Sequence, residues 1–400
     1  MVKWVVHVGA GDWQLAAIKE TQRRGYSVLA LDGNESAIGL AHADQTLVVN
    51  ITDELATLTA VKALFSTLGT KPVAVLCIAS EAGQLSAGLL RDHFCLPGLN
   101  YDTAHRLTDK SLQRKLWEGE SFSPEYAIIQ IGTDATPNAN SLPPTVIVKP
   151  VDSAGSRGIT VLENFNQNEL TEAITFAGQY SRSQKVIIER YIVGQEYTLE
   201  SVVIDGETHA LVITEKNKVQ GTYGTVANKL ASAQLSQSDA ESVIHTISEG
   251  HKRLNYRNGV SHAEVIIDND GQVWIVEIAG RGAGFAVSEK YIEFCTGYPY
   301  LFASIDFNIS GTIKKPHKIN VLPSCIRFFE CGEGILEEFY IPHFNNVESA
   351  SLLPIGAVMK RATTDGDRIG YAMVKGETQQ QFEALLKQVE EAVKVKIRVK

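Results

Sequence analysis

The chain has 400 residues, of which 44% are hydrophobic and 21% are charged, and its formal net charge is −9. This length has room for roughly two to four structural units, and the composition is that of a globular protein without biased tracts. The acidic balance, with a pI near 5.6, argues against nucleic acid or an anionic membrane as the main partner.

The five cysteines are odd in number and lack the C-x-x-C spacing of zinc and redox sites. We therefore expect reduced, mostly buried thiols rather than a disulfide framework. The first residues form an apolar strand that glycine soon breaks, which does not fit a signal peptide, and no apolar run reaches the length of a membrane span. These features lead us to expect a cytoplasmic protein.

Strands and helices alternate in the first part of the chain, which predicts a parallel α/β sheet. Short apolar runs separate longer stretches that have helical periodicity. The expected strands are residues 5–8, 28–31, 45–50 and 73–78, and the expected helices are residues 12–24, 53–68 and 83–94.

A glycine-rich turn joins the first strand to the first helix. Gly9-Ala10-Gly11, with Asp32 at the end of the second strand, matches part of a dinucleotide-binding fingerprint. The third glycine, which allows close packing of the helix, is replaced by Gln14, so a nicotinamide site is not favoured. We expect instead a tight strand-to-helix turn near a substrate pocket.

A second domain is expected after a Pro-, Asn- and Thr-rich loop within residues 111–140. It opens with a strand that ends in Lys149, a loop of small residues, and another strand. Five loop residues let backbone N–H groups approach an anion, namely Ser153, Ala154, Gly155, Ser156 and Gly158. Lys149 and Arg157 add positive charge. A mobile hairpin tip is the alternative interpretation, but a lysine at the end of an apolar strand favours a phosphate site.

The next apolar strand ends at Glu189-Arg190-Tyr191-Ile192 and turns at Gly194. Extended backbone there can present alternate N–H and C=O groups to a planar base, and Glu196 can accept both hydroxyls of a ribose. A surface hairpin with ordinary acids explains the same pattern, so this segment alone leaves both interpretations open.

The most informative stretch runs from Ser261 to Arg281 and is expected to be a β-hairpin, because Asp268-Asn269-Asp270-Gly271 separates two apolar runs. Glu264 and Glu277 then fall at the same end of the two strands. A buried carboxylate pair needs a neutralising charge and suits Mg²⁺, which takes one or two carboxylates together with phosphate oxygens. With Arg281 beside the pair, this pattern indicates phosphoryl transfer, unless the hairpin is exposed and its acids are surface residues.

Together these segments resemble the ATP-grasp superfamily, and within it the carboxylate–amine ligases related to L-amino-acid ligases and purine-pathway ligases. Six motifs occur in the family's order: VHVGAGDWQLAAIKETQRRGYSVLALDGN, SEAGQLSAGLL, TDKSLQRKLW, VIVKPVDSAGSRGI, IIERYIVGQEYTLES and HAEVIIDNDGQVWIVEIAGRGAG. The resemblance implies an ATP-grasp fold of mixed α/β and α+β class. Its parts are a parallel pre-ATP-grasp domain (residues 1–110), a lid lobe (111–200), a core lobe with the metal site (201–315) and a small C-terminal α+β domain (316–400).

The resemblance also implies roles for single residues. The nucleotide-binding set comprises Lys110 and Lys149 at the phosphates, the lid loop from Asp152 to Gly158, Glu189 to Ile192 at the adenine and Glu196 at the ribose. The metal ligands are Glu264 and Glu277, with Mg²⁺ as the expected ion and Mn²⁺ as an alternative. Arg281 matches the arginine that binds the acyl phosphate or the substrate carboxylate, and the substrate pocket is matched by Glu81, Glu215 and His262. Ala279 stands where many relatives have an asparagine ligand, which leaves open whether one or two metal ions bind.

The implied reaction is ATP-dependent formation of an amide or peptide bond through an acyl phosphate, with release of ADP and phosphate. The substrates would be a small carboxylate and an amine, amino acids among them, and relatives are commonly homodimers. An ATP-dependent carboxylase acting through carboxyphosphate and a non-catalytic nucleotide-binding protein are the alternatives. Tyr223, Phe285 and Arg327 are weaker candidates for contact with the substrate.

Overall fold

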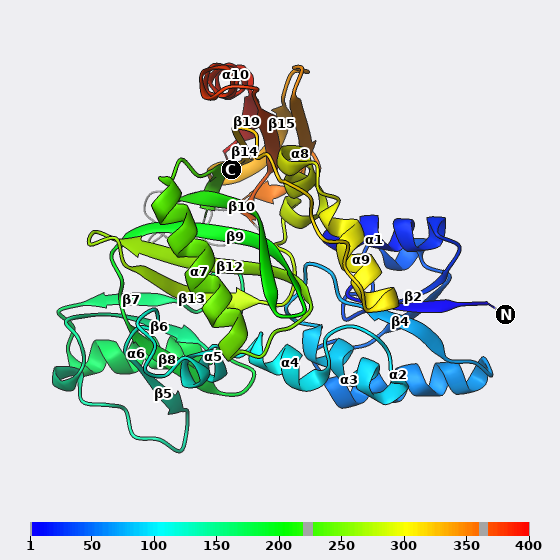
Figure 1. The fold of residues 1–400 in the computed structure, drawn as a ribbon, viewed down its shortest axis with the longest axis horizontal. Coiled ribbons are helices and arrows are strands. Elements are labelled where there is room, and N and C mark those ends of the chain that lie inside the picture. The colour runs from blue at the N-terminus through cyan, green and yellow to red at the C-terminus, as the bar shows by residue number, and fades with distance from the viewer. Residues whose placement is uncertain (1, 219–226, 360–366, 400) are drawn as a thin grey trace.

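The computed structural model describes residues 2–218, 227–359 and 367–399, which form the sheets and lobes shown in Figure 1. The N-terminal part is a parallel sheet in the order β3-β2-β1-β4, which confirms the expected α/β class. Its elements are β1 (Trp4–Val8), α1 (Asp12–Arg23), β2 (Ser27–Asp32), η1 (Leu40–His42), β3 (Gln45–Val48), α2 (Glu54–Thr67), β4 (Pro72–Leu76) and α3 (Gln84–Phe94).

Both faces of this parallel sheet are covered, as its continuous apolar strands require. Val6 and Val8 of β1 pack against α2 and α3, whereas Val5 packs on the other face with α1. The helix α9 (Tyr300–Ser310) lies on that second face through Leu301 and Ile305. The N-terminal sheet therefore packs against α9, a helix from a much later part of the chain.

The glycine turn after β1 is held by the residue that breaks the dinucleotide fingerprint. The Gln14 side chain accepts a hydrogen bond from the Gly11 N–H at 3.0 Å and donates one to the Ile78 carbonyl at 2.7 Å. Asp32 accepts a hydrogen bond from the Ala10 N–H at 2.8 Å. Gln14 and Asp32 therefore hold the backbone of this turn in place, in agreement with the expectation of a tight turn.

A small antiparallel sheet in the order β5-β8-β6-β7 forms a separate lobe, at the lower left of Figure 1. Helix α6 packs on it through Leu170 and Ile174. The elements from the first sheet to this lobe are α4 (Tyr101–Arg106), α5 (Lys110–Leu116), β5 (Tyr126–Gln130), η2 (Ala139–Ser141), β6 (Thr145–Pro150), β7 (Thr160–Glu163), α6 (Gln167–Gly178) and β8 (Lys185–Arg190).

The largest sheet has eight strands in the order β13-β12-β9-β10-β11-β14-β18-β16. Its elements up to the hairpin are β9 (Gly194–Ile204), β10 (Glu207–Lys218), β11 (Ala227–Ser232), α7 (Gln237–Arg253), β12 (Gly259–Asp268) and β13 (Val273–Ala279). Helix α7 covers one face through Val243 and Ile247, which pack with Leu199 and Val265. Because side chains alternate along a strand, residues such as Thr198 and Glu264 face the opposite side.

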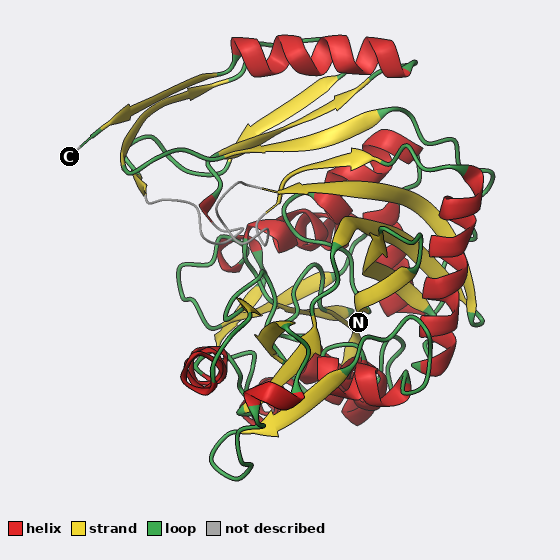
Figure 2. Cartoon of the chain, turned by 90° about the vertical axis from the view of Figure 1, so that its left-hand side faces the viewer, coloured by secondary structure: helices red, strands yellow, loops and turns green. Residues whose placement is uncertain are grey.

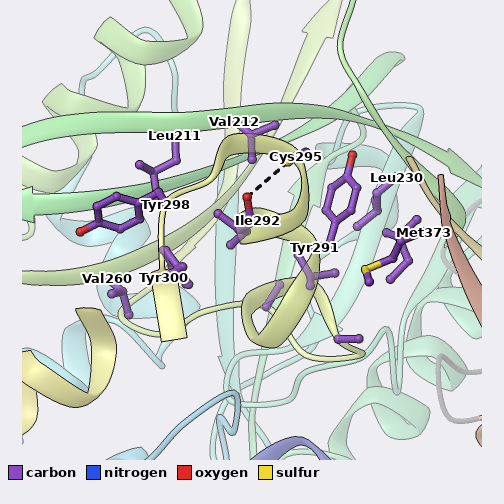
Figure 3. Packing of buried hydrophobic residues seen from close by; sticks show 14 of the residues in the cluster. Leu211, Val212, Leu230, Val260, Tyr291, Ile292, Cys295, Tyr298, Tyr300 and Met373 are labelled. Atoms are coloured by element: carbon purple, nitrogen blue, oxygen red, sulfur yellow. Dashed lines mark hydrogen bonds between the residues drawn. The ribbon is translucent and has the colours of Figure 1, made fainter. Parts of the chain in front are cut away.

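After the hairpin, a helical segment packs onto the middle of this sheet. It comprises η3 (Val287–Tyr291), a single π-helical turn, α8 (Ile292–Thr296) and α9. Figure 3 shows Tyr291, Ile292 and Cys295 among Leu230 and Met373 in the resulting apolar core. All five cysteines of the chain are free thiols, as expected.

The last part of the chain extends the large sheet and adds a small one. Strands β14 (Ser324–Phe329), β16 (Val347–Ser351) and β18 (Gly370–Lys375) join the large sheet, so that sheet runs across the boundary proposed after residue 315. A further sheet holds β15 (Gly334–Tyr340), β17 (Val358–Met359) and β19 (Lys394–Arg398), and α10 (Gln379–Ala392) lies over the strands at the top of Figure 2. No helix of the described residues is long and apolar enough to cross a membrane.

Candidate active site

Glu264 and Glu277 are directly opposite each other on β12 and β13, as the hairpin pattern predicts. The next pair in the register is Val265 with Ile275, so β13 holds one extra residue, Val276, in a bulge. The Val276 carbonyl accepts a hydrogen bond from Arg114 Nη2 at 2.9 Å. Such a bulge turns the strand locally and fixes the direction of the neighbouring side chain.

Cations surround this carboxylate pair. Lys110 Nζ lies 2.5 Å from Glu277, and Lys216 Nζ lies 3.2 Å from Glu264. Burial raises the pKa of both carboxyl groups, but Lys216 lowers that of Glu264 well below its ordinary value. Lys110 likewise lowers the pKa of Glu277, against the opposing charge of Glu264. Both side chains are therefore anionic at neutral pH.

His262 lies beside Glu264 and is bonded to a second buried acid. Its Nδ1 is 2.5 Å from Glu200 Oε1, and its Nε2 is 3.5 Å from Glu264 Oε1. Burial lowers the pKa of His262, but the Glu200 carboxylate outweighs this effect and raises it to about 10. His262 is thus a cation held between two carboxylates.

The donor set at the hairpin fits a hard divalent cation. Both carboxylates are ionised, are opposite each other and offer oxygen atoms, which is what Mg²⁺ prefers. Within the described ranges no group of three or more His, Cys, Asp or Glu side chains is placed to hold a metal. Ala279, next to the hairpin end, is buried and offers no side-chain ligand. An ion at Glu264 and Glu277 would take its other ligands from phosphate or water.

A buried ion-pair network connects the lid lobe to α5. Glu189 is only 3% exposed, and its carboxylate lies 2.8 Å from both Arg114 Nε and Lys149 Nζ. Burial lowers the pKa of Lys149, and Glu189 only partly restores it. Burial raises the pKa of Glu189, but Arg114 and Lys149 bring it below its ordinary value. The Glu189 side chain is therefore engaged with these cations, which leaves the backbone of this segment to face a ligand.

The loop of small residues after β6 lies over the lysine at the start of α5. Lys110 Nζ donates to the Ser153 carbonyl at 3.0 Å, and Arg157 Nε donates to the Ala154 carbonyl at 3.1 Å. Gly155 and Ser156 both have left-handed backbone, with φ of 68° and 60°. Backbone of this kind turns successive N–H groups toward a common point, which suits an anion.

Glu196, at the start of β9, is held by two lysines of β10. Its carboxylate lies 2.5 Å from Lys216 Nζ and 2.7 Å from Lys218 Nζ. Nearby, the Arg190 guanidinium is stacked 4.8 Å from the Trp274 ring centroid. This edge of the site therefore offers an acid flanked by cations and a flat, partly apolar surface.

At the other side of the hairpin, Arg281 reaches the N-terminal domain. Its Nε donates to Glu81 Oε2 at 2.6 Å. Burial lowers the pKa of Arg281, but Glu81 and Glu277 outweigh this and raise it. The guanidinium is therefore a fixed cation between the carboxylate pair and the N-terminal sheet.

These groups line one cavity of about 570 Å³ between the lobes. Most predicted site residues line it: Glu81, Lys110, Lys149, Ser153, Ala154, Gly155, Ser156, Arg157, Glu189, Arg190, Tyr191, Ile192, Glu196, His262, Glu264, Glu277 and Arg281. Phe285 lines it as well. Of the others, Arg327 is paired with Glu390 at 3.1 Å outside the cavity, and Tyr223 lies outside the described residues.

Glu215 is not among the lining residues, whereas its neighbour Lys216 is. Glu215 is opposite Tyr197 in the register, and Tyr197 belongs to the core under α7. Alternation along β10 therefore turns Glu215 away from the cavity and Lys216 toward it. The strand pattern could have shown that only one of the two faces the site, but not which one.

The cavity also has walls that the sequence did not reveal, namely Trp13, Arg114, Lys216, Phe328 and Arg368. Trp13 and Arg114 lie within two of the matched motifs but were not assigned to the site, and Lys216 is next to the predicted Glu215. Phe328 and Arg368 come from the C-terminal part, where no motif pointed to the site.

Comparison with known proteins agrees with this geometry. Residues 142–289 match the family model described as the ATP-grasp domain. These residues are an ATP-grasp domain. It is 24% identical over 309 residues to the L-arginine-specific L-amino acid ligase of Bacillus subtilis, covering 73% of this chain and 71% of that protein.

Solved structures show the same fold over the whole chain. The L-amino acid ligase from Bacillus licheniformis is 17% identical, with a TM-score of 0.80 and 99% of both chains covered. The biotin carboxylase domain of 2-oxoglutarate carboxylase from Hydrogenobacter thermophilus is 16% identical, with a TM-score of 0.75, 99% of this chain and 91% of that chain covered. The latter was solved with MgADP, ADP and bicarbonate. The proteins named here are thus two L-amino acid ligases and a carboxylase domain, so their names give different reactions.

Proposed function

We propose that this chain is an ATP-dependent carboxylate–amine ligase that forms an amide or peptide bond and releases ADP and phosphate. The observation that carries the proposal is the shared cavity. Ionised Glu264 and Glu277, the cations Lys110 and Lys149, and the fixed Arg281 all line it. Carboxylates for a metal, lysines for phosphates and an arginine for an acid are the parts that such a reaction needs.

The chemistry divides into two steps. A carboxylate is a poor acylating agent, so one of its oxygens first attacks the γ-phosphorus of ATP, giving an acyl phosphate and ADP. The amine then attacks the acyl carbon, phosphate leaves, and the amine loses a proton. A divalent ion bound by Glu264 and Glu277 would supply charge neutralisation at the phosphates.

The remaining work falls to residues of this chain. Lys149 and Lys110 would orient the phosphate oxygens, and Arg281 would hold the reacting carboxylate in line with them. The backbone of Glu189 to Ile192 would contact the adenine, and Glu196 the ribose. The loop around Gly155 would cover the triphosphate and exclude water, which otherwise hydrolyses an acyl phosphate.

A pairwise screen of amino acids for ADP formation tests the proposal. We expect ADP to form only when an acid and an amine are both present, together with an amide product. Bicarbonate-dependent ADP release without an amine would instead identify a carboxylase. Nucleotide binding with no turnover for any pair would identify a non-catalytic binding protein.

A further inference from the structure

Two neighbouring strands place a buried acid and a histidine directly opposite each other. Glu200 of β9 and His262 of β12 are partners in the antiparallel register. Glu200 is fully buried, and His262 is 7% exposed and lines the cavity. Glu200 Oε2 has no hydrogen-bond partner among the described residues, so the His262 ring is the direct partner of this carboxylate. Because a buried carboxylate is stable only beside a cation, the two side chains form one unit.

This unit lies next to the carboxylate pair of the hairpin along the strands. Glu264 follows His262 by two residues, so both side chains are on the same face of β12. On the other side of His262 the register partner is Ala279 of β13, which offers only a methyl group. The ring is instead bonded to β9, with its Nδ1 at 2.5 Å from Glu200 Oε1.

Both nitrogen atoms of the His262 ring face carboxylate oxygens. Nδ1 faces Glu200, and Nε2 lies 3.5 Å from Glu264 Oε1. An ionised carboxylate only accepts hydrogen bonds, so each ring nitrogen must present a hydrogen to its acid. His262 is therefore a donor on two sides, and it links Glu200 to Glu264.

The Glu264 carboxylate is held at one of its two oxygens. Lys216 Nζ lies 3.2 Å from Oε1, the same atom that His262 faces. Neither of these contacts involves Oε2. Glu277 is directly opposite Glu264 in the register. A carboxylate that is fixed through one oxygen presents the other in a defined direction, which is how outer residues orient metal ligands.

We propose that Glu200 and His262 are positioning residues of the divalent-cation site. Glu200 fixes the His262 ring, and the ring holds Oε1 of Glu264, so that Oε2 is available to a cation shared with Glu277. The proposal rests on the metal site of the proposed function and adds two residues that orient it. Removing partners of this kind weakens metal binding by about 10- to 100-fold.

The test measures Mn²⁺ binding in the presence of ADP, from the electron paramagnetic resonance signal of free Mn²⁺. This readout gives a dissociation constant without any turnover. Glu200→Gln keeps the size of the side chain but removes its charge, and we expect the dissociation constant for Mn²⁺ to rise about 10- to 100-fold. The variant also leaves a buried cation without its acid, which destabilises the fold.

A double variant separates positioning from stability. Glu200→Gln combined with His262→Gln removes both charges together, so no unpaired buried charge remains. Glu264 nevertheless loses its charged donor. We expect a urea midpoint closer to that of the wild type than the midpoint of Glu200→Gln, and Mn²⁺ binding that is still weakened about tenfold or more. Wild-type affinity for Mn²⁺ in the double variant would overturn the positioning role.

Another Glu–His pair of the same sheet provides the matched control. His209 Nε2 lies 3.5 Å from Glu207 Oε2 on β10, and neither residue is among those that line the cavity. Glu207→Gln combined with His209→Gln should bind Mn²⁺ like the wild type. An equal loss of affinity in this control would overturn the positioning role, because the effect would not depend on contact with Glu264.

Glu277→Gln separates failure of the positioning role from failure of the metal site. Unchanged Mn²⁺ affinity in Glu277→Gln would overturn the metal site of the proposed function, and the positioning role with it. Weakened binding in Glu277→Gln, together with wild-type binding in the double variant of Glu200 and His262, would overturn the positioning role alone.

Discussion

Arg281 Nε and Glu81 Oε2, which are 200 positions apart in the sequence, lie 2.6 Å from each other. This contact joins the loop after the β12–β13 hairpin to the N-terminal domain. It orients the guanidinium that we propose to hold the reacting carboxylate. The parallel domain therefore contributes directly to the cavity.

Replacing Glu81 with alanine should weaken binding of the acid substrate. Arg281 would lose the acceptor that fixes its direction, and we expect the KM for the acid to rise about tenfold, in line with the loss of one charged hydrogen bond. Affinity for MgADP should change less than this KM, because the Glu81 side chain is bonded to Arg281 and not to a residue assigned to the nucleotide. Titration calorimetry with MgADP provides this control, and an unchanged KM in Glu81→Ala would remove the positioning role.

Replacing Glu277 with glutamine should abolish ADP formation without unfolding the protein. The amide keeps the shape but removes the charge opposite Glu264, so a divalent cation loses one of its two carboxylates. We expect ADP release at background level and weakened Mg²⁺-dependent nucleotide binding. Glu338→Gln, at an exposed position of β15, should match the wild type. Normal turnover in Glu277→Gln would exclude the metal site.

Replacing Glu189 with glutamine should destabilise the protein. The substitution leaves Arg114 and Lys149 as buried cations without their carboxylate, and breaking a buried ion pair in this way costs about 3–5 kcal/mol. We expect a lower urea midpoint for unfolding, whereas Glu163→Gln, exposed at the end of β7, should leave it unchanged. Equal midpoints for the two variants would show that the network contributes little.

Acid should destabilise the protein through two buried histidines. Burial lowers the pKa of His7 and of His251 from the ordinary 6.5 to about 3. Between these values the unfolded chain binds more protons than the folded one, so stability falls as the pH drops below 6.5. Each histidine should lower the free energy of unfolding by about 2 kcal/mol between about pH 7 and about pH 5.

Urea unfolding of His251→Gln measures this contribution. The histidine is bonded to Thr208 Oγ1 at 2.9 Å and Ser261 Oγ at 2.8 Å, and glutamine can replace part of this network without taking up a proton. We expect the variant to lose less stability on acidification than the wild type. An identical pH dependence for both proteins would contradict the assignment.

Local patterns were sufficient to predict the hairpin, the small-residue loop and the parallel sheet. Each of these elements is predicted by residues that are adjacent in the sequence. The turn residues from Asp268 to Gly271 predict the hairpin, and short apolar runs predict the strands. The side of β10 that faces the cavity was not predictable in the same way. A shift of one residue in the pairing would turn Glu215 toward the cavity and Lys216 away from it. Only the pairing of β10 with β9 determines which of the two side chains faces the cavity.

The C-terminal wall of the cavity could not be predicted for a different reason. Arg368 meets Phe285 and Phe328 only because β11, β14 and β18 pair, and β14 begins 92 positions after the end of β11. Partners this far apart leave no periodic signal in either segment. A buried arginine also looks like any surface arginine in a sequence, since its burial depends on rings supplied by distant segments of the chain.

The shared eight-stranded sheet has a practical consequence for work with shortened forms of the protein. A fragment that stops before β14 would leave β11 with an open edge and uncover the apolar surface around Leu230 and Tyr291. Open edges of this kind recruit strands from other molecules. We expect such fragments to precipitate when expressed, even though they retain the six motifs from the glycine turn to the β12–β13 hairpin.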